Sequence, residues 1–320
     1  MQIFKAITRQ SAATLATILL VVAAPAAAND APSRGATAER QPYTTQAPIA
    51  MLKDLDSGEI LYARGADKRF APASMAKVMT AYVVLDLIKR GELTRDTRFT
   101  VDEATWKRWS GRGGGSTMFL RPGEKISVDD LLKGLITVSG NDAAAALAVG
   151  IDGSETAFVK RMNDVAARLG MKSSNFGTPN GWPDGGVTKV SAADLITLAD
   201  RLIRDHPGGH ARYFALAKLQ HGTSPEGKPI VQANRNPILG RFVGADGLKT
   251  GHTSEAGYCF LGSAKRDGRR LIMVVAGLPS AAARRDEAER LMSWGFATPM
   301  VANAASKKKG AVAGSGRAAP

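Results

Sequence analysis

The sequence predicts an α/β (α+β) fold in which the two ends of the ordered chain build one mixed sheet around an inserted helical lobe. Two observations support this fold class. Strand-like segments lie at 49–64 and again from 247 to 277, whereas the middle of the chain carries helical periodicity. Strands at both ends must meet to bury their apolar faces, so they are expected to share a sheet.

The first 28 residues are predicted to be a secretory signal peptide. Lys5 and Arg9 precede an apolar segment at 12–24, and small residues follow at 26–28. The apolar segment is too short to span a membrane, and no later segment approaches the necessary length. Residues 29–46 are polar and aperiodic, and are expected to form a disordered leader. The mature protein is therefore expected to be exported and soluble in the periplasm or cell envelope.

Composition limits the classes of partner. The chain has 320 residues, a net charge of +14 and one cysteine, so no disulfide framework can hold the fold. The positive charge favours anionic partners. Nucleic acid is not expected, because the protein is exported and carries no recognition motif for it. An anionic cell envelope is the more economical partner. Residues 299–320 are rich in Ala, Gly, Ser and Lys and are expected to form a disordered basic tail.

The first ordered elements are expected to be a β-hairpin and a buried helix. Segments 49–55 and 60–64 have strand character and are joined through a turn at 56–58. An apolar run at 78–88 follows, and Gly91 ends it.

The remaining elements are expected from capping residues and apolar periodicity. Helices are predicted in the middle of the chain at 127–138, 143–149, 155–169 and 191–203. The C-terminal part is predicted to contain strands at 248–252, 258–265 and 271–277, followed by a helix at 283–296.

Ser74 and Lys77 form the first candidate catalytic pair. They stand three residues apart at the start of the first apolar run, and positions i and i+3 share one face of a helix. A lysine amine beside a serine hydroxyl is an activated nucleophile in outline. The spacing alone is weak evidence, because Ser-x-x-Lys is expected about once by chance in such a chain. A second copy does occur, at 306–309 in the tail.

Two further short motifs follow in chain order, each at the end of a predicted element: Ser139-Gly140-Asn141 and Lys249-Thr250-Gly251. This ordered set, with Asp in place of the middle Gly, is typical of penicillin-binding proteins and class A β-lactamases. The chain resembles in particular the low-molecular-mass penicillin-binding proteins that are exported serine-type D-alanyl-D-alanine carboxypeptidases. The segments that carry the resemblance are 118–123, 139–143, 246–253, 256–258 and 294–296.

The resemblance covers residues 49–296 and implies a β-lactamase/transpeptidase-like fold with a mostly antiparallel sheet. We therefore expect a single penicillin-binding, transpeptidase-like catalytic domain at 47–298. Most carboxypeptidases of this group carry a second, β-rich domain, which is expected to be absent here.

Acyl transfer from a peptide needs a nucleophile, a base and donors for the developing oxyanion. Ser74 is the expected nucleophile, and Lys77 is the expected general base. Lys77 must be neutral for part of the cycle, and burial together with the nearby charge of Lys249 would lower its pKa. Ser139 is expected to relay a proton toward the leaving group, and Asn141 to hold Lys77 and the substrate backbone.

Substrate binding is expected on the last motif. Lys249 and Thr250, on an exposed strand edge, suit a terminal carboxylate, and Gly251 allows a close approach. The resemblance further implies that the backbone N–H groups of the nucleophile and of His252 form the oxyanion hole. It also implies that Arg284 helps to bind the carboxylate.

The resemblance implies a function: removal of the terminal D-Ala from peptidoglycan pentapeptides ending in D-Ala-D-Ala, through an acyl-serine intermediate. Peptidoglycan stem peptides are the expected partners, and β-lactam antibiotics the expected covalent inhibitors. No cofactor is expected. No metal is expected either, because His206, His210 and His221 form no helical metal-binding pair.

Three alternatives remain open. A β-lactamase would need a deacylating glutamate, and the only glutamates between the second and third motifs, Glu155 and Glu226, lack the surroundings of the class A residue. A D,D-endopeptidase that cleaves cross-links is favoured by the expected absence of the second domain, but the sequence around all three motifs is more similar to the carboxypeptidases. A catalytically inactive peptidoglycan-binding module is disfavoured by the intact motifs.

Overall fold

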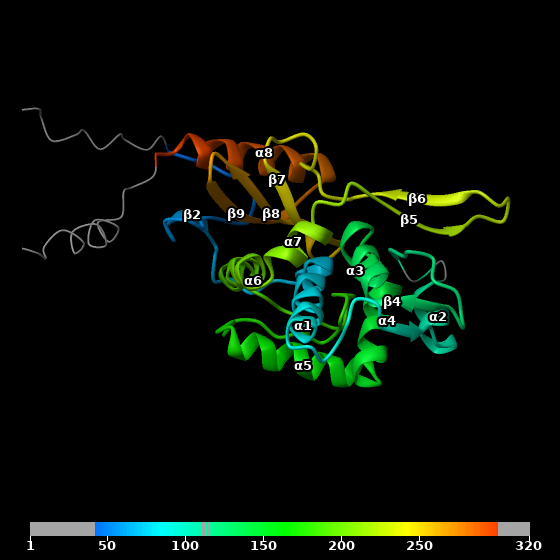
Figure 1. The fold of residues 1–320 in the computed structure, drawn as a ribbon. Helices are drawn as coiled ribbons and strands as arrows, with labels where there is room; N and C mark the ends of the chain where they lie inside the picture. The colour runs from blue at the N-terminus through cyan, green and yellow to red at the C-terminus, as the bar shows by residue number, and fades with distance from the viewer. Residues whose placement is uncertain (1–41, 111–112, 114, 300–320) are drawn as a thin grey trace, which may run out of the picture. The chain divides into compact units, whose positions relative to one another are not determined.

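A five-stranded antiparallel sheet is the centre of the structure, a computed structural model that describes residues 42–110, 113 and 115–299. Its strand order is β2-β1-β9-β8-β7, and every neighbouring pair is antiparallel. The strands are β1 (Ile49–Asp54), β2 (Ile60–Arg64), β7 (Ala245–Thr253), β8 (Gly257–Arg266) and β9 (Arg269–Leu278) (Figure 1). The predicted sheet, built from both ends of the chain around a helical lobe, is confirmed, but it is antiparallel throughout rather than mixed.

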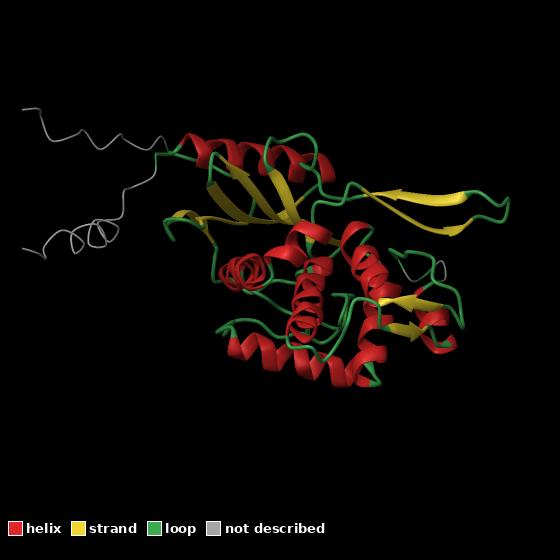
Figure 2. Cartoon of the chain, viewed as in Figure 1, coloured by secondary structure: helices red, strands yellow, loops and turns green. Residues whose placement is uncertain are grey.

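The pairing of β1 with β9 joins the two ends of the chain. Ile49 lies opposite Ala276, and Asp54 lies opposite Leu271. Successive residues of both strands enter two different apolar clusters, one on each face of the sheet. The helical lobe covers one face, and α8 (Ala281–Ala297) covers the other (Figure 2). Both faces are therefore buried, which explains why these strands are continuous apolar runs in the sequence.

The helical lobe contains the predicted helices, with small shifts at their ends: α1 (Lys77–Lys89), α3 (Val128–Thr137), α4 (Asn141–Asp152), α5 (Glu155–Arg168) and α6 (Ala192–Asp205). Ser127, Ser154 and Ser191 cap α3, α5 and α6. Each hydroxyl accepts a hydrogen bond of 3.1 Å from the backbone N–H three residues later. These caps fix where the lobe helices begin.

Several short elements were not predicted: η1 (Ala73–Ala76), β3 (Arg98–Thr100), α2 (Glu103–Trp109), β4 (Lys125–Ser127), α7 (Pro207–Tyr213), β5 (Lys218–Thr223) and β6 (Pro229–Ala233). β5 and β6 form a hairpin that projects from the sheet and lobe (Figure 1). After the hairpin, a loop leads the chain back to the sheet, where β7 begins.

The start of the ordered chain differs from the expected boundary. Residues 42–46 were assigned to the disordered leader, yet they pack against α8. Tyr43 donates a hydrogen bond of 2.9 Å to the Glu287 carboxylate, which also accepts one from Thr45. Glu287 is buried, so these two donors supply the polar partners that a buried carboxylate requires.

The predicted signal peptide at 1–28, the leader at 29–41 and the tail from residue 300 onward lie outside the described residues. Among the helices within 42–299 that the structure describes, none is long and apolar enough to cross a membrane.

Candidate active site

Ser74 and Lys77 lie where a 3-10 turn passes into a helix. Ser74 is in η1, and Lys77 is the first residue of α1 with a fully buried side chain. Lys77 Nζ lies 2.9 Å from Ser74 Oγ, so the predicted pair is formed. The same nitrogen donates hydrogen bonds of 2.7 Å to Asn141 Oδ1 and of 2.7 Å to the carbonyl oxygen of Asn180. The lysine is therefore held at three points.

The environment of Lys77 disfavours its ammonium form. Burial lowers the pKa of Lys77 well below its usual value, and the positive charges of Lys249 and Arg235 lower it further. Asp142 acts in the opposite direction with a smaller effect. Lys77 is thus suited to act as a base, as expected from the sequence.

A tight turn between α3 and α4 presents Ser139 and Asn141. Ser139 has a left-handed backbone, with φ of +63°, and Gly140 is the N-cap of α4. The backbone N–H of Asn141 donates to the Ser116 carbonyl oxygen at 2.7 Å, which holds the turn against the segment that contains Ser116. Asp142 strengthens this tie, because its buried carboxylate accepts from the backbone N–H groups of Met118 and Leu120, at 3.1 and 3.2 Å.

β7 supplies the third motif and is the edge strand beside β8. The side chain of Lys249 differs from its expected exposed position: it is only 2% exposed, and its Nζ lies 3.2 Å from the Thr250 carbonyl oxygen. Burial lowers the pKa of Lys249 to about 7, and the charges of Arg235 and Arg284 contribute. Lys249 is therefore buried beside the residues that line the cavity and can affect a bound ligand only through its charge.

Gly251 is required by a close approach of β7 to η1. A Cβ atom at this position would lie 2.5 Å from the carbonyl oxygen of Pro72. Any side chain would push the strand away from the segment that carries Ser74. The close approach that the structure shows at Gly251 is made by the protein's own backbone at Pro72.

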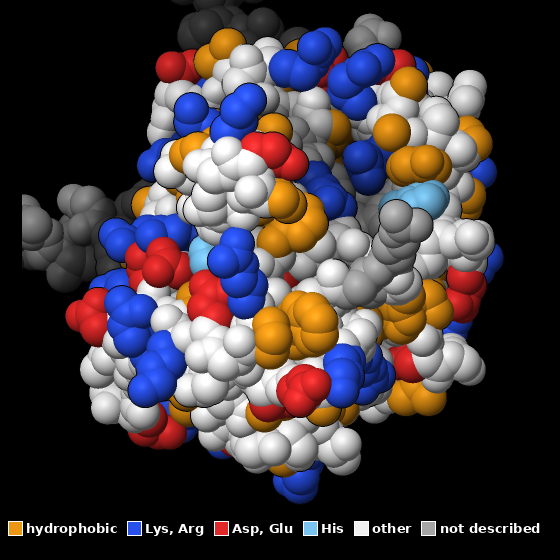
Figure 3. Space-filling view, turned by 90° about the vertical axis from the view of Figure 1, so that its right-hand side faces the viewer, with side chains coloured by type: hydrophobic (Ala, Val, Ile, Leu, Met, Phe, Trp, Pro, Cys, Tyr) orange, Lys and Arg blue, Asp and Glu red, His pale blue; other side chains and the backbone are white. Residues whose placement is uncertain are grey.

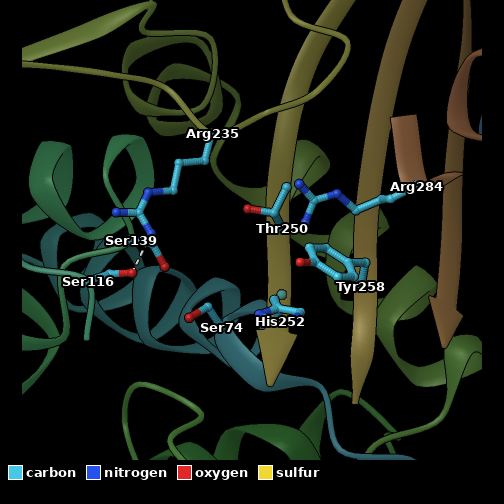
Figure 4. Close-up of a pocket in the computed structure, with 9 residues that line it drawn as sticks. Ser74, Ser116, Ser139, Arg235, Thr250, His252, Tyr258 and Arg284 are labelled. Atoms are coloured by element: carbon cyan, nitrogen blue, oxygen red, sulfur yellow. Dashed lines mark hydrogen bonds between the residues drawn. The ribbon is translucent and has the colours of Figure 1, made fainter. Parts of the chain in front are cut away.

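A cavity of about 440 Å³ opens above Ser74. Of the predicted residues, it is lined by Ser74, Ser139, Thr250, Gly251, His252 and Arg284. Lys77, Asn141 and Lys249 are buried next to these residues, so all nine predicted residues belong to one site. Figure 4 shows Ser139 and Arg235 on one wall of the cavity, with Thr250 and Arg284 on the other.

Four residues of the site were missed by the sequence analysis. Ser116, Arg235 and Tyr258 line the cavity, and Asn180 binds Lys77 from a loop. Tyr258 lies opposite His252 in the β7–β8 register, and the two rings are 4.0 Å apart. Arg284 lies over the same tyrosine ring, at 5.5 Å from its centre. Tyr258 could have been found from the sequence, because it lies in segment 256–258, which carries part of the family resemblance. Arg235 and Asn180 lie in loops that match no motif.

The site carries more positive than negative charge. Positive side chains are spread over the face shown in Figure 3, and some lie inside the hollow near its centre. In the part of the chain that the structure describes, no group of three or more His, Cys, Asp or Glu residues could hold a metal ion. Anionic ligands are therefore the natural complement of this cavity.

A family model described as D-alanyl-D-alanine carboxypeptidase, of the S11 peptidases, matches residues 35–280. The chain belongs to this family. The resemblance found from the motifs is thereby confirmed. The D-alanyl-D-alanine carboxypeptidase DacA of Haemophilus influenzae is 39% identical over 262 residues, which cover 80% of this chain and 63% of that relative. The chain thus spans less than two thirds of the length of this member of the family.

Two solved structures of penicillin-binding proteins are similar to this member of the carboxypeptidase family. Penicillin-binding protein 5 from Haemophilus influenzae has a TM-score of 0.74 at 39% identity, over 80% of this chain and 72% of the other. Penicillin-binding protein D2 from Listeria monocytogenes, in its ampicillin-bound form, has a TM-score of 0.69 at 34% identity, over 80% of this chain and all of the other. The expected transpeptidase-like fold is confirmed.

Proposed function

We propose that this protein is a serine D-alanyl-D-alanine carboxypeptidase that removes the terminal D-Ala from peptidoglycan pentapeptides. The observation that carries the proposal is the hydrogen bonding of Lys77. A neutral lysine amine has two N–H groups and one lone pair. The Asn141 and Asn180 oxygens can only accept, so they take both N–H groups. The lone pair is left for the hydroxyl of Ser74, which then donates its proton to Lys77.

Acylation follows from this arrangement. Ser74 Oγ attacks the carbonyl carbon of the terminal peptide bond while its proton passes to Lys77 Nζ. The C–N bond then breaks, and the leaving amine takes a proton relayed through Ser139 from Lys77. This transfer returns Lys77 to its neutral form. A water molecule next attacks the acyl-serine ester and gives one proton to Lys77. The ester C–O bond then breaks, Lys77 returns that proton to Ser74 Oγ, and the shortened peptide is released with a free carboxylate.

The cavity wall formed by β7 and α8 would orient the substrate. The Thr250 hydroxyl and the Arg284 guanidinium line this wall and suit the terminal carboxylate of the leaving D-Ala. The backbone N–H groups of Ser74 and His252 are proposed to hold the oxyanion. Lys249 lies buried beside Thr250 and, in its protonated form, stabilises negative charge on this side of the site.

β-Lactam antibiotics are proposed to acylate Ser74 and to remain bound. The two glutamates between Asn141 and Lys249 are engaged away from the cavity lining. Glu155 accepts a hydrogen bond of 3.0 Å from Trp109, and Glu226 accepts one of 2.6 Å from Ser224. Neither is placed to activate a water molecule for rapid deacylation, so a β-lactamase activity is not supported.

The protein is further proposed to act in the periplasm or cell envelope after removal of residues 1–28. The signal-peptide pattern of the sequence supports this location, and peptidoglycan is present only outside the cytoplasmic membrane.

A direct test uses a pentapeptide ending in D-Ala-D-Ala, with products identified by mass. We expect the release of one D-Ala by the mature protein in the presence of EDTA. The Ser74→Ala variant should lose turnover by at least about 10³-fold while keeping the thermal unfolding temperature of the parent. Release of D-Ala at the parent rate by that variant would overturn the proposal.

A further inference from the structure

Two guanidinium groups face the same cavity from opposite walls. Arg284 extends from α8 toward Thr250, and Arg235 extends from the loop after β6 toward Ser116 and Ser139 (Figure 4). Among the residues that the structure describes, no carboxylate forms an ion pair with Arg235 or with Arg284. Arg235 donates a hydrogen bond to Ser116 Oγ, and the buried Nε of Arg284 has no hydrogen-bond partner within the described part of the chain.

One terminal carboxylate does not account for both arginines. A carboxylate has two oxygens and is commonly bound by one guanidinium in a bidentate pair. Arg284 and Thr250 already offer such a place on the wall formed by β7 and α8. Arg235 lines the same cavity from the opposite wall, beside Ser139, whose hydroxyl is proposed to protonate the leaving amine. Both guanidinium groups therefore face the leaving side of the cavity.

The loop that carries Arg235 is held at several points, so the guanidinium is presented by a fixed backbone. The backbone N–H of Arg235 donates to the Thr137 carbonyl oxygen at 3.3 Å. Asn234 donates to the Leu216 carbonyl oxygen at 2.8 Å, and Asn236 donates to the Gly247 carbonyl oxygen at 3.1 Å. An arginine with a purely structural role would be expected to pair with an acidic residue. The Arg235 side chain instead faces an open cavity, while these hydrogen bonds hold its loop in place.

We propose that Arg235 is a subsite for a second carboxylate on the leaving side of the substrate. The cavity would then favour peptides whose leaving amine belongs to a unit with two carboxylates over peptides that release D-Ala alone. A peptide cross-link supplies such a unit, because the leaving amine there belongs to a second stem peptide. This inference rests on the proposed function, and it deepens that function toward cleavage of cross-links.

The test compares donors with the same acyl part, diacetyl-L-Lys-D-Ala, and different leaving residues. D-Glu carries the second carboxylate, D-Gln is its neutral isostere, and D-Ala is the reference. We expect kcat/KM for the D-Glu donor to exceed that for the D-Gln donor by about 10-fold or more, as for a charge-assisted hydrogen bond. Arg235→Gln should bring this ratio close to one, whatever its effect on the rate with the D-Gln donor.

Arg241→Gln is the matched control. Arg241 lies on the same loop, pairs with Glu289 and does not line the cavity, so its variant should keep the parent ratio. A parent ratio near one would overturn the inference. Equal losses on D-Glu and D-Gln donors in Arg235→Gln, together with a shifted pH profile, would also overturn it, and would assign Arg235 to lowering the lysine pKa values.

Failure of the proposed function would be visible separately, as absence of Ser74-dependent cleavage of all three donors. The subsite can still be tested in that case through protection of Ser74 from a labelled penicillin. The dipeptide D-Ala-D-Glu should slow labelling of the parent more than D-Ala-D-Gln does, and this difference should vanish in Arg235→Gln. Equal protection by both dipeptides in the parent would reject the subsite.

Discussion

Lys77 Nζ and Asn141 Oδ1 are 2.7 Å apart, although 63 residues lie between them in the chain. This contact joins the start of α1 to the start of α4. It also orients the amine, because an amide oxygen can only accept a hydrogen bond. The direction of the Lys77 lone pair toward Ser74 therefore depends on a neutral acceptor at position 141.

We expect Asn141→Asp to shift the acid limb of the pH–rate profile toward higher pH. A carboxylate beside Lys77 stabilises the ammonium form and raises the pKa of Lys77. Because the neutral amine is the active form, a higher pH is then needed to reach full activity. The measurement is kcat/KM for a D-Ala-D-Ala donor from about pH 5 to about pH 10. An unchanged profile would show that Lys77 is not the base.

We expect Lys249→Met to be more stable than the parent near neutral pH, although inactive. Lys249 has a pKa of about 7 when folded, against a usual value of 10.5, so the unfolded chain binds an additional proton between these values. The parent therefore loses stability as pH falls from about 10.5 to about 7, with a slope of up to about 1.4 kcal/mol per pH unit. Methionine removes this linkage.

The test is urea unfolding of the parent and of the Lys249→Met variant at about pH 7, 8 and 9. It measures how the free energy of unfolding of each protein depends on pH. The advantage of the variant should shrink as the pH rises. A constant difference in the free energy of unfolding would mean that Lys249 is protonated in the folded protein.

We expect Arg284→Gln to lower kcat/KM by about 10- to 100-fold for donors with a free terminal carboxylate, because a charge-assisted pair is lost. Donors with an amidated terminus should change little. Arg285→Gln is the control, since the next residue of α8 pairs with Asp286 and does not line the cavity. An equal loss on amidated and free donors would assign Arg284 to the structure of the site.

We expect benzylpenicillin to form a long-lived adduct on Ser74. The opened ring stays tethered and leaves no room for water, and the described residues that line the cavity include no glutamate to activate one. Each tenfold decrease in the hydrolysis rate corresponds to about 1.4 kcal/mol of barrier. Intact mass recorded over several hours should show the adduct persisting. Rapid turnover without an adduct would support a β-lactamase instead.

Strong apolar patterns and caps made much of the fold predictable. The strands at 49–54 and 60–64 agree with their predicted ends within one residue, and the serine caps of α3 and α6 were visible in the sequence. The hairpin of β5 and β6 was missed because most of its residues are exposed and it lacks a regular apolar alternation. Its place is set by side-chain contacts, such as Arg121 to the Thr223 carbonyl oxygen at 2.8 Å.

The residues of the candidate site were predictable where they lie close together in the sequence and form short motifs. Ser74 and Lys77 meet through helical spacing alone, so the local sequence is sufficient. Arg235 and Asn180 reach the site only through the tertiary fold, from loops whose sequences match no motif. The buried position of Lys249 was also missed, since it depends on which side of β7 faces the lobe.

The pairing of β1 with β9 sets the order in which the protein can mature. Ile49 and Ala276 are more than 200 residues apart, so β1 must wait for almost the whole domain to be synthesised before its partner exists. During that time an apolar strand is exposed and prone to aggregation. All three motifs are synthesised before β9 completes the sheet. A chain stopped before β9 would therefore carry every motif but lack the strand that joins β1 to β8 in the sheet.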